Sequence, residues 1–175
     1  MIRREDIQYR VSRVTKNGAI FLIYIDARTC ARELDEQYGK LNWQFSWEKE
    51  VSDQWAIKGK LKVYNPEIKE WVEYQDVGYP NEAKTYEGEG ADFQWMKDAV
   101  SDSLKRCGVQ ANVGRELYDA PFLYTEECEW YEKDGQKRFK KLYPLGEKMI
   151  EGNIDKWYQK LSILNLKKEK NGISK

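Results

Sequence analysis

The sequence has 175 residues, with 30 basic and 30 acidic side chains and a formal net charge of zero. It contains no histidine, which excludes a histidine general base, a histidine-activated nucleophile and a histidine-ligated zinc ion. Three widely separated cysteines fit neither a disulfide framework nor a zinc knuckle, and no apolar run is long enough to span a membrane. We therefore expect a reduced, cytoplasmic protein, in which the distribution of charge decides what is bound.

The N-terminal part of the chain predicts a buried strand followed by a helix. Residues 18–25 are mostly apolar and begin at an Asn-Gly turn, as expected of a strand. Asp26 is suited to cap a helix over residues 27–38, and Gly39 is suited to end it. Three residues recur with helical spacing and are expected to face the core: Ala31, Leu34 and Tyr38.

Three strands are predicted next, at about residues 42–51, 54–64 and 70–79. In the middle strand apolar side chains alternate with three lysines, which therefore share one face of the sheet: Lys58, Lys60 and Lys62. Such a row of cations suits a phosphate track or an ordinary solvated face. Taken by itself, the row favours the solvated face.

Residues 92–107 predict an amphipathic helix that ends in two adjacent cations, Lys105 and Arg106. Asp92 is a suitable N-cap, and Gly108 is a suitable C-terminal stop. The two cations suit a phosphate-binding role, and they equally suit the simpler role of complementing the negative end of the helix. The apolar face is expected to contain Phe93, Met96, Val100, Leu104 and Cys107.

The last third of the chain differs in character. Residues 128–143 predict a charged hairpin that turns at Asp134-Gly135, and residues 151–166 predict a helix. We predict an α+β fold in which residues 1–120 form an antiparallel β-β-β-α core with its packing helix. Residues 121–175 would supply a C-terminal hairpin, a helix and a basic tail that pack on this core or on a neighbouring subunit.

Several motifs resemble the Rad52 superfamily of single-strand annealing proteins, in particular its phage-encoded Sak-type members. The central block is Asp76-Val77-Gly78-Tyr79, a polar spacer, and then residues 97–106 (KDAVSDSLKR), and the VGY-to-LKR spacing matches without a gap. Residues 39–43 (GKLNW) and 108–118 (GVQANVGRELY) resemble flanking segments of the family's annealing core. The resemblance covers about residues 8–120.

This resemblance implies ATP-independent binding of single-stranded DNA and annealing of complementary strands in recombination and repair, by closed homo-oligomeric rings. Lys105 and Arg106 would grip phosphates, Arg13 could join them, and Tyr24 stands where the family has a DNA-contacting tyrosine. A weaker contact for the second strand would come from Lys58, Lys60 and Lys84. No enzymatic step, cofactor or metal ion is expected. A single-strand binding protein or a recombinase is a candidate protein partner.

Two other functions remain open from the sequence. Asp76 with Glu82-Ala83-Lys84 resembles the spaced acids and lysine of restriction-type nucleases, which hold Mg²⁺ and orient water. In a chain so rich in Glu and Lys this pattern arises easily by chance. Alternatively, the protein binds single-stranded DNA without annealing it. The bases would then stack on Trp43, Trp47 and Trp55, although alternating sheet residues of this kind more often face a core.

Overall fold

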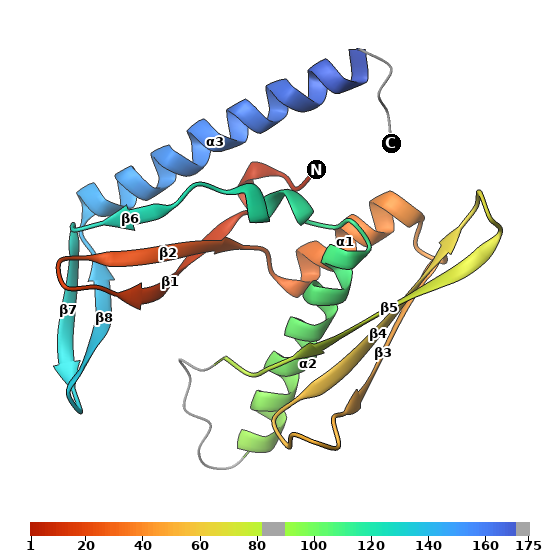
Figure 1. Cartoon of the computed structure of the whole chain (residues 1–175), viewed down its shortest axis with the longest axis horizontal. Coiled ribbons are helices and arrows are strands. Elements are labelled where there is room, and N and C mark those ends of the chain that lie inside the picture. The colour runs from red at the N-terminus through yellow and green to blue at the C-terminus, as the bar shows by residue number, and fades with distance from the viewer. Residues whose placement is uncertain (82–89, 171–175) are drawn as a thin grey trace. The chain divides into compact units, whose positions relative to one another are not determined.

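The structure is a computed structural model that describes residues 1–81 and 90–170, and it divides into two compact units (Figure 1). The first unit contains Met1–Ile2 and Ile25–Arg115, and the second contains Arg3–Tyr24 and Glu116–Lys175. Strands pair antiparallel throughout the described residues, and helices accompany them in both units. This confirms the predicted α+β class. A division of the chain at residue 120 stays a prediction.

The first unit has the predicted β-β-β-α order. Its three-stranded sheet has the strand order β3-β4-β5, and α2 packs against one face of this sheet (Figure 1). The helix α1 precedes the sheet in the chain. The elements are α1 (Ala27–Tyr38), β3 (Trp43–Lys49), β4 (Ile57–Asn65), β5 (Glu70–Gly78) and α2 (Ala91–Gln110).

The boundaries of α1 follow from its sequence. The Asp26 carboxylate accepts a hydrogen bond from the Thr29 backbone N–H at 2.7 Å, and this bond holds the pKa of Asp26 below its ordinary value. Gly39 is the C-cap, as predicted. Leu34 is fully buried as expected, whereas Ala31 and Tyr38 are half-buried. The Tyr38 hydroxyl donates a hydrogen bond to the Ala111 carbonyl at 2.8 Å.

Three expectations for α2 were wrong. The helix begins at Ala91 behind a left-handed Gly90, so residue 92 lies inside the first turn and is not the N-cap. Phe93 is 78 % exposed, because the buried stripe is Trp95, Ala99, Ser103 and Cys107. Gly108 does not end the helix. A Cβ there would lie 2.6 Å from the Cys30 sulfur, so this glycine allows α1 to approach α2 closely.

Two glycines bring α2 close to the sheet. A Cβ on Gly78 would lie 2.3 Å from both the Ala99 carbonyl oxygen and the Ser103 backbone nitrogen. On Gly59, in β4, it would lie 2.8 Å from the Ser103 hydroxyl oxygen. Ser103 is fully buried, and its hydroxyl donates to the Val100 carbonyl at 2.9 Å. These glycines therefore allow α2 to lie close against β4 and β5.

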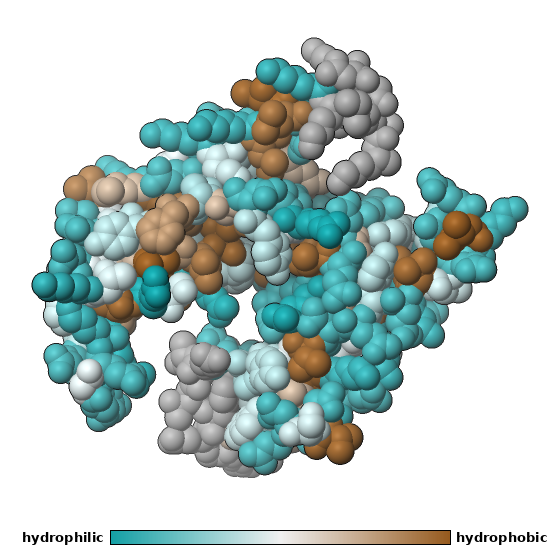
Figure 2. All heavy atoms as spheres, in the orientation of Figure 1, coloured by the Kyte–Doolittle hydropathy of each residue, from teal (hydrophilic) through white to brown (hydrophobic). Residues whose placement is uncertain are grey.

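The second unit combines a three-stranded sheet of order β1-β2-β6 with a separate hairpin and a long helix. The hairpin turns at Asp134-Gly135, as predicted, with both residues at positive φ, and its surface is largely hydrophilic (left of Figure 2). The elements are η1 (Arg4–Asp6), β1 (Gln8–Val14), β2 (Ala19–Tyr24), η2 (Arg115–Asp119), β6 (Leu123–Thr125), β7 (Cys128–Lys133), β8 (Gln136–Leu142) and α3 (Pro144–Lys170).

The helix α3 is longer than the predicted 151–166. Pro144 occupies its first position, where the missing N–H costs nothing. Arg4 ties the N-terminal segment to α3 through ion pairs with Glu151 and with Asp155, the latter at 2.6 Å. Ile154 is fully buried. In the described parts of the chain, no helix is both long enough and apolar enough to cross a membrane.

Candidate nucleic-acid interface

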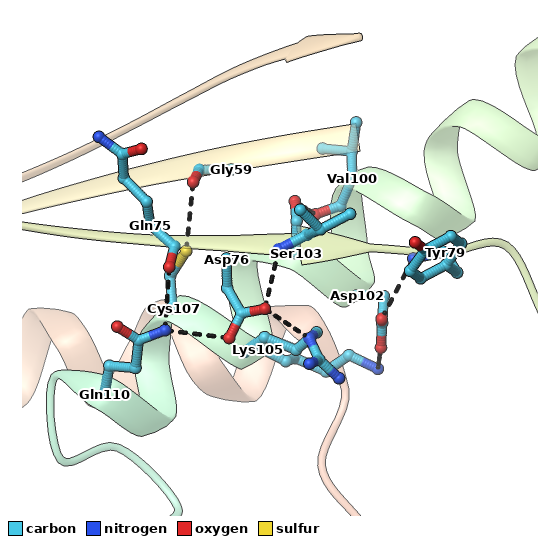
Figure 3. A network of polar contacts seen from close by, with 12 residues as sticks. Gly59, Gln75, Asp76, Tyr79, Val100, Asp102, Ser103, Lys105, Cys107 and Gln110 are labelled. Atoms are coloured by element: carbon cyan, nitrogen blue, oxygen red, sulfur yellow. Dashed lines mark hydrogen bonds and ion pairs between the residues drawn. The ribbon is translucent and has the colours of Figure 1, made fainter. Parts of the chain in front are cut away.

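The end of β5 and the last turns of α2 form one hydrogen-bonded network (Figure 3). Asp76, on β5, accepts a hydrogen bond from Arg106 Nε at 2.9 Å and another from the Gln110 side chain at 2.9 Å. The Val77 backbone N–H donates to the same carboxylate at 2.8 Å. Partial burial opposes ionisation of Asp76, but these donors outweigh it and hold the pKa of Asp76 below its ordinary value. Asp76 is therefore an anchored carboxylate that orients Arg106.

A second carboxylate links the same two elements. Asp102, on α2, accepts a hydrogen bond from the Tyr79 backbone N–H at 3.3 Å, and its other oxygen lies 3.8 Å from Lys105 Nζ (Figure 3). The Arg106 side chain remains 50 % exposed and the Lys105 side chain 30 % exposed. The two predicted phosphate-binding residues thus lie together on α2, each held by a carboxylate and each still open to solvent. They do not end the helix as predicted, because α2 continues for one more turn to Gln110.

The lysines predicted to contact a second strand lie elsewhere on the first unit. Lys58 and Lys60 occupy the face of the β3-β4-β5 sheet opposite α2, because the residues that alternate with them are the buried ones. Lys60 Nζ lies 2.9 Å from a Glu48 carboxylate oxygen, and Lys62 Nζ lies 3.4 Å from one of Glu73. Lys60 and Lys62 are therefore each paired with an acidic side chain on a neighbouring strand. The contact of Lys58 and Lys60 with a second strand stays a prediction.

Arg13 and Tyr24 lie in the second unit, on the β1-β2 hairpin. A one-residue register shift between Val11 and Arg13 places Arg10 on the same side of the hairpin as Arg13, whereas plain alternation would separate them. The Arg10 guanidinium carbon lies 5.8 Å from the centre of the Tyr24 ring, a cation–π arrangement. The structure thus adds Arg10 to the two residues predicted here.

The nuclease alternative depends on Asp76, whose two carboxylate oxygens already accept hydrogen bonds from Arg106 and Gln110. Glu82 and Lys84, the latter also a predicted DNA contact, lie outside the described residues. Within residues 1–81 and 90–170, no cluster of three or more acidic or cysteine side chains is arranged to hold a metal ion. Geometry around Asp76 thus favours a positioning role over metal binding.

The three tryptophans proposed as stacking platforms differ in their surroundings. Trp43 is half-buried, and its indole N–H donates to the Asp35 carboxylate at 2.8 Å. Trp47 is 45 % exposed on β3. Trp55 lies before β4, and its ring makes an edge contact with Trp95 at 5.3 Å between centroids. Of the three, Trp47 and Trp55 present ring surface to solvent.

Comparison with known proteins identifies the family of this chain. Residues 1–137 match the Rad52/22 family of double-strand break repair proteins. The chain belongs to this family. The match includes β3, β4, β5 and α2, and therefore both the VGY motif at the end of β5 and the LKR motif in α2.

Two curated relatives are similar to the chain, and both bear the name single-stranded DNA-binding protein DdrA. The protein from Deinococcus deserti is 34 % identical over 107 residues, which are 61 % of this chain and 46 % of that protein. The protein from Deinococcus radiodurans is 32 % identical over 130 residues, which are 74 % of this chain and 52 % of that protein. The chain thus spans about half the length of these relatives. A phage origin stays a prediction.

Sequence reasoning missed the residues that position the binding residues. Gln110 was not considered, although it lies four positions after Arg106 and therefore on the same side of α2. Asp76 was noted as part of the family motif, and the only role considered for its carboxylate was in a nuclease site. Its pairing with Arg106 joins residues 30 positions apart in the chain, and no local pattern signals such a contact.

Proposed function

We propose that this protein binds single-stranded DNA through its phosphates and anneals complementary strands, without ATP, in recombination and repair. The observation that carries the proposal is the pair Lys105 and Arg106, held by carboxylates one turn before the end of α2 while still exposed. Membership of the Rad52/22 family and the names of the two DdrA relatives support the choice of ligand.

Annealing requires that one strand be held with its bases open to a second strand. Contacts to phosphates achieve this, because they fix the backbone without covering the edges that pair. Arg106 can take this role because Asp76 fixes its Nε side and half of its side chain stays exposed. Tyr24, flanked by Arg10, offers a ring that packs against a sugar or base. No covalent bond is made or broken in such a reaction.

We propose further that the protein works as a homo-oligomeric ring, as the family resemblance implies. The helix α3 offers surface for contacts between subunits, because large apolar side chains remain exposed along it. These side chains are Leu145, Met149, Ile163, Leu164 and Leu166. Light scattering of the purified protein would give the oligomeric mass, and a monomer at micromolar concentration would contradict the ring.

The decisive experiment follows the pairing of two complementary dye-labelled oligonucleotides by energy transfer, without ATP and with or without EDTA. Faster pairing that survives EDTA is the expected result. Binding without faster pairing would leave a single-strand binding protein that does not anneal. Loss of signal from cut strands, only when Mg²⁺ is present, would establish the nuclease alternative instead.

A further inference from the structure

The β7-β8 hairpin has two chemically different faces. Glu129 pairs with Lys141 and Trp130 with Phe139, so the register shifts by one residue and leaves Lys140 between the two pairs. Lys140 and Lys141 therefore point to the same side as Glu129. Their Nζ atoms lie 2.5 Å and 3.4 Å from the two Glu129 carboxylate oxygens, which confirms that side-chain direction.

One face of the hairpin is anchored within the second unit. The Phe139 ring makes an edge contact with Phe21 of β2, at 5.6 Å between centroids. Lys137 Nζ donates to the Lys16 carbonyl at 2.8 Å and lies 3.6 Å from the centre of the Trp130 ring. Contacts from β8 thus fix this face on the β1-β2 hairpin, while Trp130 of β7 packs on the Lys137 side chain.

The opposite face, here called the hairpin outer face, is exposed and strongly basic. Its four cations oppose a single acid, Glu129, whose pKa is held below its ordinary value by the hydrogen bond from Lys140. Tyr131 pairs across the strands with Arg138 and is 45 % exposed among these cations. The face consists of Glu129, Tyr131, Lys133, Gln136, Arg138, Lys140 and Lys141.

We propose that the hairpin outer face is an additional binding surface for single-stranded DNA, and this inference rests on the proposed function. Cations along one strand would contact successive phosphates, and the Tyr131 ring would stack on a base. An exposed ring between cations suits a ligand that has both phosphates and flat bases. An acidic peptide would use the cations alone. The family match ends at residue 137, so Arg138, Lys140 and Lys141 lie beyond it.

The first test compares two double variants with equal loss of charge. Arg138→Gln/Lys141→Gln removes two cations from the outer face and leaves Lys140 to pair with Glu129. Lys156→Gln/Lys160→Gln removes two exposed lysines from α3 and serves as the control. The affinity of each protein for a single-stranded oligonucleotide is measured by fluorescence anisotropy at several salt concentrations.

The outer-face variant is expected to bind about fivefold more weakly at 0.1 M salt, since one phosphate contact, that of Arg138, contributes about fivefold there, whereas Lys141 must first leave Glu129. Its plot of log affinity against log salt should be shallower by about 0.7 units of slope, while the control keeps the wild-type slope. Wild-type protein that does not bind DNA would overturn the proposed function and this inference together. Wild-type binding with an unchanged outer-face variant would overturn this inference alone.

A crosslinking experiment tests the stacking of Tyr131 directly. Oligonucleotides that contain 5-iodouracil are irradiated with the full-length protein, and the crosslinked tryptic peptide is identified by mass spectrometry. A crosslink in the peptide of residues 116–133 that persists in Tyr131→Phe and disappears in Tyr131→Ala is expected. A crosslink insensitive to Tyr131→Ala would contradict stacking. A glutamate-rich peptide is tested for binding in parallel. If its binding depends on Arg138 and Lys141 while DNA binding does not, the face would be assigned to an acidic protein instead.

Discussion

The two groups of cations on the first unit lie on opposite faces of one sheet and are held in different ways. Arg106 is bonded to Asp76, a half-buried carboxylate that is itself fixed by the Val77 backbone and by Gln110. Lys60, on β4, pairs instead with Glu48, an exposed side chain on the neighbouring strand. One cation is oriented by a carboxylate that is itself held by other hydrogen bonds, and the other shares a solvated surface with an exposed acid.

This difference decides what a phosphate must do when it arrives. At Arg106 the phosphate can add to the guanidinium while Asp76 stays in place, because an arginine offers several donors in a fixed plane. At Lys60 the phosphate must compete with Glu48 for a single ammonium group. The first arrangement is pre-organised for an anion, and the second is typical of an ordinary solvated face.

The largest expected effect comes from destroying the close approach that creates this difference. Gly78→Ala would place a methyl group 2.3 Å from backbone atoms of α2, which side-chain movement cannot relieve. We expect a loss of about 3 kcal/mol in the free energy of unfolding and weaker DNA binding, measured by urea denaturation and by anisotropy. Gly152→Ala is the control, because open space surrounds that helical glycine and the change should stabilise α3 by about 1 kcal/mol. Equal stability of the Gly78 variant and wild type would show that α2 lies farther from β5.

The second effect tests the α2 cations themselves. Lys105→Ala/Arg106→Ala should fold normally, because both side chains are partly exposed, and should bind single-stranded DNA about 25-fold more weakly at 0.1 M salt. Circular dichroism melting checks the fold, and anisotropy gives the affinity. Wild-type affinity in a folded double variant would remove the end of α2 from the binding site.

How far the sequence predicted the fold depended on whether the signal was local. The helix α1 was predicted to the residue, since Asp26 and Gly39 mark its two ends within the same short segment. The predicted apolar face of α2 was right at Cys107 and partly right at Met96 and Val100, but wrong at Phe93, because a second stripe through Trp95 overlaps it. The second stripe contains the small residues Ala99 and Ser103. These residues pack closely against Gly59 and Gly78 on the strands, and that contact cannot be seen from the helix sequence alone.

The candidate site shows the same limit. Adjacent Lys105 and Arg106 were visible in the sequence, because they end the polar side of one helix. Their carboxylate partners were not assigned. Asp102 lies three positions before Lys105 on the same helix, so that pair was within reach of sequence reasoning. Asp76 lies on a different element, and its pairing with Arg106 is recognised only when the packing of α2 on β5 is known.

A smaller effect, whose sign is informative, concerns Asp76. Asp76→Asn removes a negative charge near the bound phosphates, which alone would strengthen binding, but it also removes the charge-assisted bond that orients Arg106. We expect orientation to dominate, with about fivefold weaker binding by anisotropy, equivalent to one phosphate contact. Glu73→Gln removes the same charge on the other face of the sheet and should not weaken binding. Tighter binding by the Asn variant would mean that Asp76 only repels DNA.

The pH dependence of stability offers an independent check on Asp76. The pKa of Asp76 is lowered in the folded protein, so its contribution to stability is complete above the unfolded value of about 3.9. This contribution is lost as the pH falls through the lowered pKa. In urea denaturation between pH 6 and pH 2, Asp76→Asn should therefore lose less stability on acidification than wild type. Parallel curves would show that Asp76 is not engaged by Arg106.

The smallest expected effect on DNA binding comes from substituting Lys60 and Lys62 of β4. This substitution also tests whether the two faces of the sheet differ in the way described. Lys60→Gln/Lys62→Gln removes two positive charges, as the α2 double variant does, so the general electrostatic change is the same. Because Glu48 and Glu73 already compete for these lysines, we expect less than a twofold change in affinity for one strand. A loss of affinity as large as that of the α2 variant would show that DNA displaces these acids. It would also show that orientation by a half-buried carboxylate such as Asp76 does not distinguish a phosphate site from a solvated face. A loss confined to the annealing step, with single-strand affinity unchanged, would instead assign Lys60 and Lys62 to the contact with the second strand.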